Sequence, residues 1–576
     1  VSVERGPGGR WALLRDGRPH EVRGAGTDGG RLPLLAALGA TSFRTWGVGP
    51  DTEAQLDEAE ELGMSVTLGL WLGRRAHRFD WHDREHVARQ RRAVRDAVLA
   101  HRDHPALLMW GIGNEMEQGN DDPVMWEEIG ALVRMVQRLD RHHPTMVVTA
   151  ELGEANAERL QRYVPEVDVW GINSYGRIAS LSERLDAVGY DGPFVVTELG
   201  HPAEWETPKT AWGTPREVSS SAKIAGYRAS FSAIARDPRC LGAYAFVWSR
   251  GVTPVDTWHA LLGPGDVRFA PTDALFEAWV GLPPANRSPS VRALHAPFDG
   301  AEVAPGAPIR ARFDARDPEG EALRYAWILH RDSPEPLRRG AGAVHTCHDA
   351  EGADLAGRAE FVGAAPQTPG AWRLLGFAID PGGRAAYASA RFRVAGAAPE
   401  GPVFPFWVDD VFAPSGFMGD ASERVTETRC PPRPGFCQGR CRKFTYHGAR
   451  RGEHGWAGVA WMHPQGNWRG RFPGVPVPPG AEAVELVAWG ARGGERVLFS
   501  AGRGDVDGFE QTLRVELTTE PTTYRIRLDA GVRDEVVFGF GWRADDPGRA
   551  PLTFHVADVR WVGGSAPAGY YGAPGP

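Results

Sequence analysis

The sequence predicts a (β/α)₈ barrel followed by two all-β sandwich domains. Two observations support this prediction. From about Arg23 to Leu282, short apolar runs alternate with amphipathic helical patterns, as they do where parallel strands are joined by helices. After Asn286 the pattern changes to short alternating strands separated by turn signals, which is typical of sandwich domains. A chain of 576 residues is also long enough for three domains.

Eight apolar runs are the candidates for the barrel strands. They are Val22–Gly26, Ser42–Trp46, Ser65–Leu70, Leu107–Gly113, Met146–Ala150, Val167–Asn173, Phe194–Thr197 and Gly242–Trp248. The helical stretches between them include Thr52–Leu62, His86–Ala100, Val124–Leu139, Ala155–Tyr163 and Ser221–Ala235. Eight strands that alternate with helices over about 260 residues fit a closed barrel. A doubly wound open sheet is the alternative, but no Gly-rich nucleotide fingerprint follows the first strand.

The predicted boundaries divide the chain into four parts. These are the barrel at 1–284, an immunoglobulin- or fibronectin-like β-sandwich at 285–397, a jelly-roll β-sandwich at 398–565 and a disordered tail at 566–576. The second part carries Asp-Gly and Pro-Glu-Gly turn signals but no candidate chemistry, so we interpret it as a spacer. The third part contains clearly alternating segments such as AVELVAWGA and EVVFGFGW. The tail is rich in Gly, Pro and Ala, which disfavours a packed structure.

Charge and hydropathy exclude several partners. With 65 Lys and Arg against 73 Asp and Glu, the net charge is −8, and a general nucleic-acid binder would need a basic face instead. No apolar run approaches the roughly 18 residues that span a bilayer, so we expect no membrane span. The chain begins at Val1, as a chain does after removal of a signal peptide. We therefore expect a secreted protein, extracellular or periplasmic.

Cysteine and tryptophan usage fit this expectation. The five cysteines are Cys240, Cys347, Cys430, Cys437 and Cys441. The last three fall within twelve residues without a fourth ligand at zinc spacing, so a short-range disulfide is favoured over a zinc site. The 21 Trp outnumber the 11 Tyr. We assign about half of the indoles to core packing, and the excess favours carbohydrate, whose C–H faces stack on indole rings.

Two glutamates stand where predicted barrel strands end. Asn114 and Glu115 follow the fourth apolar run, and Glu198 directly follows the seventh, in PFVVTELGH. Active sites of (β/α)₈ barrels lie at the carboxyl ends of the strands, so both carboxylates should face one mouth. A retaining glycosidase uses such a pair, one carboxylate as nucleophile and the other as acid and then base. The surroundings must keep the acid protonated near neutral pH.

At these positions the sequence resembles the clan A glycoside hydrolases, especially the family 2 and family 5 barrels. The resemblance covers about half of the chain and rests on GNE after strand four and TELG after strand seven. It implies Glu115 as acid/base and Glu198 as nucleophile, with Asn114 bonded to the sugar 2-hydroxyl. It also implies Arg44 near the nucleophile and Tyr175 hydrogen-bonded to it. Trp248, at the end of strand eight, would stack under the sugar.

Other strand-end residues are candidate sugar contacts. Trp46 and Trp71 follow strands two and three, and Trp205 and Trp212 lie in the loop after strand seven. For each of these four residues, stacking on a sugar and packing in a loop are equally compatible with the sequence. His201 lies in the loop after Glu198 and is a candidate substrate contact. The predicted substrate-binding residues are Arg44, Trp46, Trp71, Asn114, Tyr175, His201 and Trp248.

Further acidic residues have plainer interpretations. Glu151 ends strand five and is interpreted as substrate-binding or structural, and Glu117 as solvated or helix-capping. No cofactor or catalytic metal is expected, although Asp409, Asp410 and Asp420 are candidate ligands for a structural Ca²⁺. In the third part, Trp456, Trp461 and Trp468 could form a binding face, as in carbohydrate-binding modules, although core packing is favoured for any one of them.

The most natural function is retaining hydrolysis of a β-linked polysaccharide, with a β-glucan favoured. Family 2 enzymes usually carry accessory domains before the barrel, whereas here about 22 residues precede it and the accessory regions follow. This order favours an enzyme that acts on a polymer. One alternative is a β-glucan transglycosylase with the same residues. Two others are a catalytically inactive carbohydrate-binding protein and a metal-dependent barrel hydrolase, but the strand ends offer no His/Asp ligand set for a metal.

Overall fold

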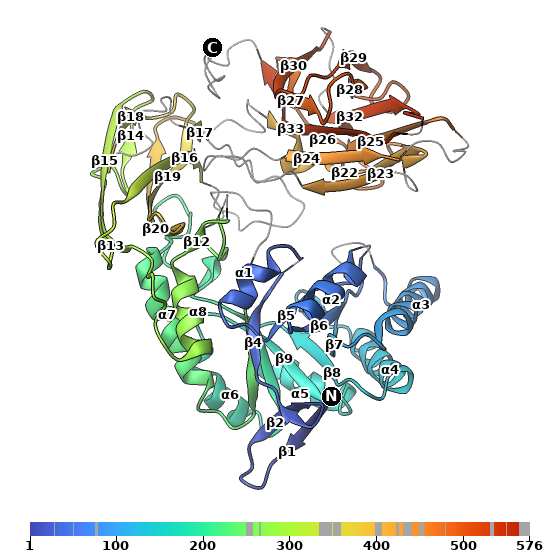
Figure 1. The fold of residues 1–576 in the computed structure, drawn as a ribbon, viewed down its shortest axis with the longest axis vertical. Helices are drawn as coiled ribbons and strands as arrows, with labels where there is room; N and C mark the ends of the chain where they lie inside the picture. The colour runs from blue at the N-terminus through green and yellow to red at the C-terminus, as the bar shows by residue number, and fades with distance from the viewer. Residues whose placement is uncertain are drawn as a thin grey trace.

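The computed structural model describes most of the chain in three successive regions (Figure 1). It covers residues 1–27, 29–49, 51–74, 79–248, 257–263, 266–332, 348–349, 359–397, 406–421, 425–429, 441–447, 454–477, 480–529, 535–548 and 550–563. The barrel runs from blue to green, a first β-rich region follows in green and yellow, and a second one is orange to red. The predicted disordered tail lies outside the described residues.

Eight parallel strands close into a barrel, which confirms the predicted fold class. They pair in the order β10-β11-β4-β5-β6-β7-β8-β9, and β9 closes back onto β10. The strands are β4 (Val22–Gly26), β5 (Ser42–Arg44), β6 (Ser65–Leu70), β7 (Leu107–Ile112), β8 (Thr145–Thr149), β9 (Val169–Ser174), β10 (Phe194–Leu199) and β11 (Cys240–Ala245). Every residue of β6 to β10 is buried, because helices cover the outside and side chains fill the inside.

Helices connect the barrel strands. They are α1 (Leu32–Ala37), α2 (Thr52–Glu61), α3 (Arg84–His101), α4 (Pro123–Leu139), α5 (Glu154–Tyr163), α6 (Leu181–Ala187), α7 (Ser220–Ile234) and α8 (Pro271–Val280). The Asp83 side chain caps α3 by accepting hydrogen bonds from the backbone N–H groups of Glu85 and His86, as its sequence position predicts. The sequence analysis did not identify α1, α6 and α8.

A small antiparallel sheet precedes the barrel. Its strands are β1 (Ser2–Arg5), β2 (Trp11–Arg15) and β3 (Arg18–Pro19), none of which the sequence analysis predicted. Leu13 of β2 packs in one apolar cluster with Val22 and Leu241, which lie near the amino ends of β4 and β11. The sheet therefore covers the end of the barrel opposite the predicted active-site mouth.

The second region is a sandwich of two sheets. One sheet has the order β12-β20-β19-β16-β17, with β14 also paired to β20, and the other has the order β13-β15-β18. The strands are β12 (Arg268–Phe269), β13 (Ser290–His295), β14 (Glu302–Val303), β15 (Pro308–Arg316), β16 (Arg324–Arg331), β17 (His348–Asp349), β18 (Glu360–Ala364), β19 (Gly370–Ile379) and β20 (Arg384–Val394). Phe313, Trp327 and Phe392 belong to the apolar cluster of this region.

The barrel and this sandwich share a sheet and a core. Strand β12 precedes α8 in the chain, yet it pairs in parallel with β20. Phe269 and Val267 form one buried cluster with Leu375 and Phe377 of β19. A buried ion pair joins Glu217 to Lys223 of α7 at 2.6 Å, and Arg373 of β19 reaches the same carboxylate at 2.9 Å. The second region is therefore packed directly against the barrel, and its interpretation as a spacer without chemistry of its own stays a prediction.

The third region is a second sandwich of two antiparallel sheets. Their orders are β23-β24-β33-β27-β30, with β21 paired to β33, and β22-β25-β32-β28-β29, and a separate pair joins β26 to β31. The elements are β21 (Phe406–Trp407), α9 (Val408–Val411), β22 (Ala413–Gly419), β23 (Val425–Arg429), β24 (Cys441–Tyr446), β25 (Trp456–Met462), β26 (Val475–Pro476), β27 (Ala481–Gly490), β28 (Arg496–Ala501), β29 (Gln511–Glu516), β30 (Thr522–Arg527), β31 (Glu535–Val536), β32 (Phe538–Asp545) and β33 (Leu552–Gly563). Trp461, Trp542 and Trp561 fill the core between the sheets.

Cysteine chemistry is only partly visible. Cys441 is disulfide-bonded, while Cys430 and Cys437, the other members of the predicted short-range pairing, lie outside the described residues, as does Cys347. Cys240 is free.

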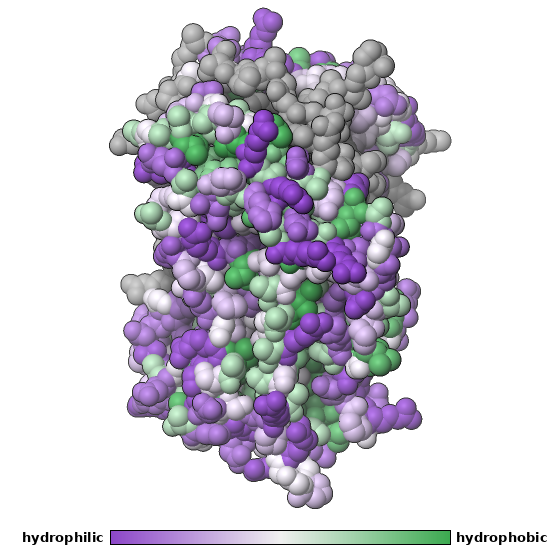
Figure 2. Space-filling model, turned by 90° about the vertical axis from the view of Figure 1, so that its left-hand side faces the viewer, coloured by the Kyte–Doolittle hydropathy of each residue, from purple (hydrophilic) through white to green (hydrophobic). Residues whose placement is uncertain are grey.

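The surface is mixed in character. On the face shown in Figure 2, hydrophilic and hydrophobic residues are intermingled from the barrel end upward. Among the described residues, no helix is both long and apolar enough to cross a membrane.

Candidate active site

The two predicted catalytic glutamates lie at the carboxyl ends of barrel strands. Glu198 is the penultimate residue of β10 and is 5% exposed. Glu115 follows β7 by three residues and has a φ of 52°, a left-handed conformation that costs energy in a residue with a Cβ. Its backbone N–H donates to the Val148 carbonyl of β8 at 2.9 Å, which holds this strained turn in place.

Three side chains surround the Glu198 carboxylate. The Tyr175 hydroxyl donates to Oε2 at 2.7 Å, and the Trp46 indole N–H donates to Oε1 at 2.9 Å. The Arg44 guanidinium lies 3.4 Å from Oε1 and is itself fixed by the Thr197 carbonyl at 2.8 Å. The expected contacts of Arg44 and Tyr175 with Glu198 are thus present. The hydrogen bond from Trp46 was not predicted, because a strand-end position does not reveal which way an indole N–H points.

A chain of hydrogen bonds connects this carboxylate to Glu115. Arg44 donates to Asn114 Oδ1 at 2.6 Å, and Asn173 Nδ2 donates to the same oxygen at 3.3 Å and to Glu115 Oε1 at 2.9 Å. Thr197 in turn donates to Asn173 Oδ1 at 2.7 Å. Because an arginine can only donate, Asn114 must present its oxygen to Arg44 and keep its amide N–H groups for another acceptor. A sugar hydroxyl could be that acceptor.

Asn173 is a site residue that the sequence analysis passed over. It lies in β9, inside the predicted strand Val167–Asn173, and it is 1% exposed. Like Asn114, it is a polar residue where an apolar strand ends, so the same signal could have identified it.

The surroundings give the two carboxyl groups different roles. Burial and the nearby charge of Glu198 raise the pKa of Glu115 to about 7, although the hydrogen bond from Asn173 opposes the shift. Burial and the charge of Glu198 also raise the pKa of Tyr175, so this phenol stays a hydrogen-bond donor. Glu115 has a raised pKa, and Glu198 is surrounded by three donors. An acid and a nucleophile are expected to differ in this way.

Of the other predicted substrate contacts, only Trp71 is open to solvent. Trp71 is 40% exposed, and Arg74 lies over its ring at 5.4 Å. Trp46 is 6% exposed and contacts Glu198, so it offers no open platform. Trp248 is completely buried, and its indole N–H donates to the Arg31 carbonyl at 3.3 Å, so neither ring face is open for stacking in this structure.

His201 is also buried. It is 3% exposed, and its Nε2 contacts the Trp258 carbonyl, while its ring stacks on His259. In contrast, Trp205 is 63% exposed and meets the Tyr175 ring edge-on at a centroid distance of 5.7 Å. The open aromatic surface beside the catalytic pair is therefore formed by Trp71 and Trp205. The predicted contacts of Trp248 and His201 need a rearrangement that this structure does not show.

Two further glutamates have structural partners. Glu151 accepts from Ser174 at 2.9 Å and forms an ion pair with Arg184 at 2.8 Å. Glu117 is not the solvated or helix-capping residue that its position suggested. Its Oε1 accepts from the backbone N–H of Ala150, its Oε2 is buried without a partner, and burial raises its pKa.

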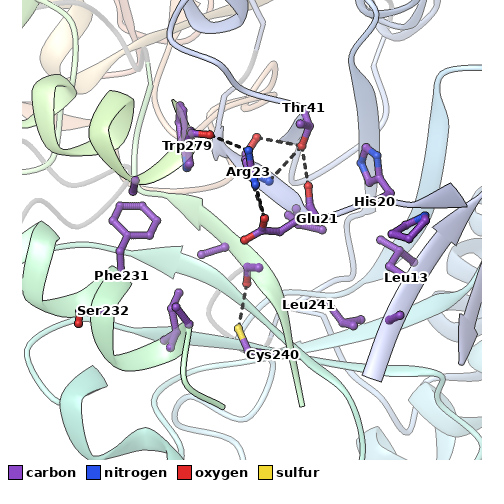
Figure 3. A pocket seen from close by; sticks show the side chains of 18 of the residues that line it. Leu13, His20, Glu21, Arg23, Thr41, Phe231, Ser232, Cys240, Leu241 and Trp279 are labelled. Carbon is purple, nitrogen blue, oxygen red and sulfur yellow. Dashed lines mark hydrogen bonds and ion pairs between the residues drawn. The ribbon is translucent and has the colours of Figure 1, made fainter. Parts of the chain in front are cut away.

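A large cavity lies elsewhere in the barrel region. It has a volume of about 870 Å³ and is lined by β2, the start of β4, α7 and α8, with Trp11, Leu13 and Trp279 among its residues. Figure 3 shows Arg23 in its wall, held by Glu21 and the Trp279 carbonyl. Because this cavity includes the amino ends of β4 and β11, it is remote from Glu115 and Glu198.

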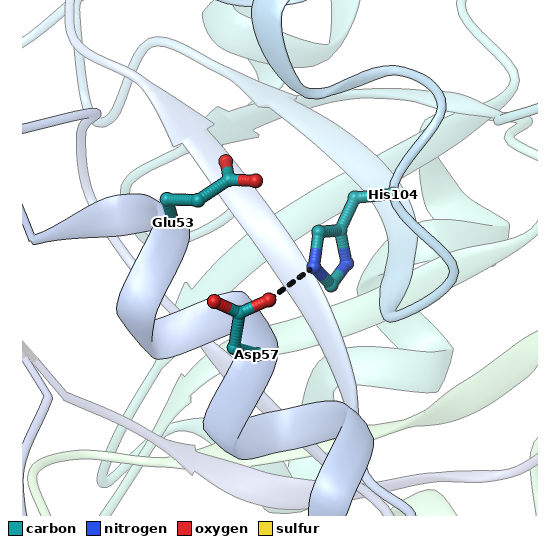
Figure 4. Close-up of side chains that lie close together, drawn as sticks. All are labelled: Glu53, Asp57 and His104. Carbon is teal, nitrogen blue, oxygen red and sulfur yellow. Dashed lines mark hydrogen bonds and ion pairs between the residues drawn. The ribbon is translucent and has the colours of Figure 1, made fainter.

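One group of side chains in the barrel region has the spacing of a metal site. Glu53, Asp57 and His104 lie together on the outside of the barrel (Figure 4). His104 Nδ1 accepts the Ala106 N–H at 3.1 Å, which leaves the proton on Nε2, the atom that faces Asp57. That tautomer cannot offer Nε2 to a metal.

The predicted calcium ligands in the third region are engaged by protein donors. Asp409 accepts from Trp461 at 2.8 Å and pairs with Arg442, and Asp420 accepts from Tyr446 and the His454 N–H. The side chain of Asp410 is not among those that the structure describes. Trp461 is in the core, whereas Trp456 and Trp468 are half-buried and each lies beneath an arginine.

Comparison with known proteins assigns the barrel. Residues 39–206 match the TIM barrel domain of the glycosyl hydrolases of family 2. The barrel is therefore similar to the barrels of glycoside hydrolases of this family. This barrel carries Asn114, Glu115 and Glu198 at the strand ends where the clan A resemblance places the catalytic residues, and the matched range includes all three.

Similar proteins cover only parts of the chain. A β-galactosidase of Bacteroides ovatus, BoGH2A, is 26% identical over 206 residues, which are 29% of this chain and 22% of that relative. The chain thus spans about a fifth of the length of that curated relative. Among solved structures, a β-galacturonidase of Eisenbergiella tayi is 18% identical with a TM-score of 0.38 over 49% of this chain and 54% of its own. Gas2p of Saccharomyces cerevisiae in complex with laminari-oligosaccharides is 15% identical with a TM-score of 0.34, covering 48% and 66%.

Proposed function

We propose that this protein is a retaining glycosidase that cleaves a β-linked polysaccharide, with Glu198 as nucleophile and Glu115 as acid/base. The observation that carries the proposal is the contrast between the two carboxyl groups. Three donors surround the Glu198 carboxylate, while burial and the charge of Glu198 raise the pKa of Glu115 to about 7.

The reaction proceeds in two steps on this site. Glu198 attacks the anomeric carbon, while Glu115 protonates the departing glycosidic oxygen. Glu115, now a carboxylate, then removes a proton from water, and the water oxygen displaces Glu198 from the sugar. Tyr175 and Trp46 hold Glu198 at the angle of attack, and Asn114 offers its amide to a neighbouring hydroxyl. None of these steps needs a cofactor.

The open aromatic residues support a polymer as substrate. Trp71 and Trp205 are exposed beside the site, and indole rings at both places could hold sugar units on either side of the scissile bond. A β-glucan is the first polymer to test, and the protein would meet it outside the cell.

The test is product analysis on β-glucans, mannans, galactans and glucuronides with three proteins. The wild type should release oligosaccharides, and Glu198→Gln should lose at least about 10³-fold in kcat, because the amide cannot form the covalent intermediate. Glu151→Gln is the matched control, since Glu151 also ends a barrel strand but pairs with Arg184. This control should keep most of the activity.

The outcomes separate the alternatives. Products longer than the starting oligosaccharide would show transglycosylation by the same residues. Full activity of Glu198→Gln would refute the nucleophile assignment. Binding of polysaccharide by the wild type without turnover of any substrate would favour the inactive carbohydrate-binding protein.

A further inference from the structure

Three carboxylates meet at one edge of the second region. Asp317 follows β15, Glu321 lies in the loop before β16, and Asp380 follows β19. Each offers an oxygen within 4.8 Å of the oxygens of the other two. Asp317 is 3% exposed and Asp380 is 4% exposed, so two of the charges are taken almost completely out of water.

Each buried aspartate has one oxygen with a protein partner and one without. Asp317 Oδ1 accepts from the N–H groups of Glu319 and Glu321, both at 2.9 Å, and Asp380 Oδ1 accepts from the Arg384 N–H at 2.8 Å. Asp317 Oδ2 and Asp380 Oδ2 are buried and have no hydrogen-bond partner among the described residues. Buried carboxylate oxygens without a donor are costly, and a cation held between the two would offset this cost.

The neighbouring arginines bond to other groups, although Arg268 lies near enough to Asp380 for their charges to interact. Arg287 pairs with Glu319 at 2.9 Å, and Arg384 pairs with Asp273 at 2.6 Å. Arg268 donates to the Gly382 carbonyl. Within the described part of the chain, none of these cations forms an ion pair with Asp317, Glu321 or Asp380.

We propose that Asp317, Glu321 and Asp380 bind a calcium ion. The donors are all oxygens, which disfavours zinc and other metals that prefer nitrogen or sulfur. Glu321 is exposed and can rotate to meet the ion, and water and backbone carbonyls can complete the six to eight ligands that Ca²⁺ accepts. Mg²⁺ requires a stricter octahedral geometry and releases its water reluctantly.

The ion would stabilise the junction between the barrel and the sandwich. The turn after Asp380 touches the barrel, because the Gly383 carbonyl accepts the Arg268 N–H at 2.9 Å and Arg384 reaches Asp273 of α8. The loop 317–321 belongs to the facing side of the sandwich. Calcium would therefore join two loops of the second region next to the strand β12 that enters its sheet.

The experiment uses the full chain freed of metal with EDTA. Thermal unfolding is followed with and without millimolar Ca²⁺, and calorimetric titration with CaCl₂ gives the stoichiometry. We expect one Ca²⁺ per chain and a rise in Tm of about 2–8 °C. Asp317→Asn and Asp380→Asn should abolish both effects. Each amide oxygen can still accept the backbone N–H bonds, so both variants should fold.

Glu319→Gln is the control, because Glu319 lies in the same loop but pairs with Arg287. It should keep the calcium response. A wild type with no heat of binding and no change in Tm would overturn the proposal, as would a response that persists in both asparagine variants. An equal response to Mg²⁺ would overturn the choice of calcium. These measurements do not depend on glycosidase activity.

Discussion

Of the hydrogen bonds to Glu198, the one that the Tyr175 hydroxyl donates is the shortest, at 2.7 Å. Hydrogen bonds to charged groups contribute about 1.5–3 kcal/mol, so we expect Tyr175→Phe to lower kcat by about 10- to 100-fold. Tyr227→Phe is the matched control, because the Tyr227 hydroxyl is also buried but contacts the Phe246 carbonyl instead. Steady-state kinetics on the substrate found in the panel measures both. Equal losses in the two variants would mean that packing, not the bond to Glu198, is responsible.

The pKa of Glu115 predicts the alkaline limit of activity. Glu115 must carry a proton when the leaving oxygen departs, and its pKa is raised to about 7. We therefore expect kcat/KM to fall as the pH rises through about 7. The charge of Glu117 contributes to this elevation, so Glu117→Gln should move the limit to lower pH. A limit that stays in place in a variant lacking Glu115 would assign the ionisation to another group.

Single residues could be predicted from the sequence where their role follows from a strand end. Glu115, Glu198, Arg44, Asn114 and Tyr175 all lie at such ends, and the structure brings them together. The orientation of side chains in the loops could not be predicted. Trp248 and His201 lie close to the mouth along the chain, but packing against segments far away in sequence turned them inward.

Among the elements, the contact of α7 with β19 and β20 depends on a buried charge. Glu217 precedes α7, and its pKa is lowered to about 2, because Lys223, Arg373 and Arg391 outweigh the opposite effect of burial. Glu217→Gln would remove the carboxylate that Lys223 and Arg373 share, whereas Arg391 would keep its ion pair with Asp332. We expect a loss of about 3–5 kcal/mol in the free energy of unfolding, measured by denaturant titration.

Glu302→Gln provides the control for this measurement. Glu302 pairs with Arg393 at the surface of the same region, and exposed pairs contribute about 0–1 kcal/mol. Acid should mimic the Glu217 substitution. Since the folded pKa lies below the unfolded value, the stabilisation is present above about pH 4.5 and is lost as the pH falls toward 2. Similar losses in the two variants would show that the buried network contributes nothing specific.

The barrel strands were the elements best predicted from sequence. A strand buried on both faces is a continuous apolar run, and β4 and β6 have the bounds that the runs indicate. The helices α1 and α6 have six and seven residues, too few for a helical period to stand out. The strands β1 to β3 were missed because they are short and only partly buried.

At the scale of the whole molecule, the order of barrel and sandwiches followed from the changes in pattern along the chain. The boundary at 284 was placed where helical periodicity ends. Pairing between β12 and β20 joins residues that are more than a hundred positions apart, and a local pattern carries no signal of such a contact. For the same reason, the network of ion pairs at Glu217 could not be predicted from the sequence.

The shared sheet has a consequence for how this chain can be divided. A protein truncated at 284 would keep Phe269 and Val267 but lose the strands that bury them, and it would leave Glu217 and Lys223 facing water. Such a fragment should aggregate or unfold, whereas a cut at 397 should leave a folded protein. We therefore expect that the third region can be removed without unfolding the barrel, whereas the second region cannot.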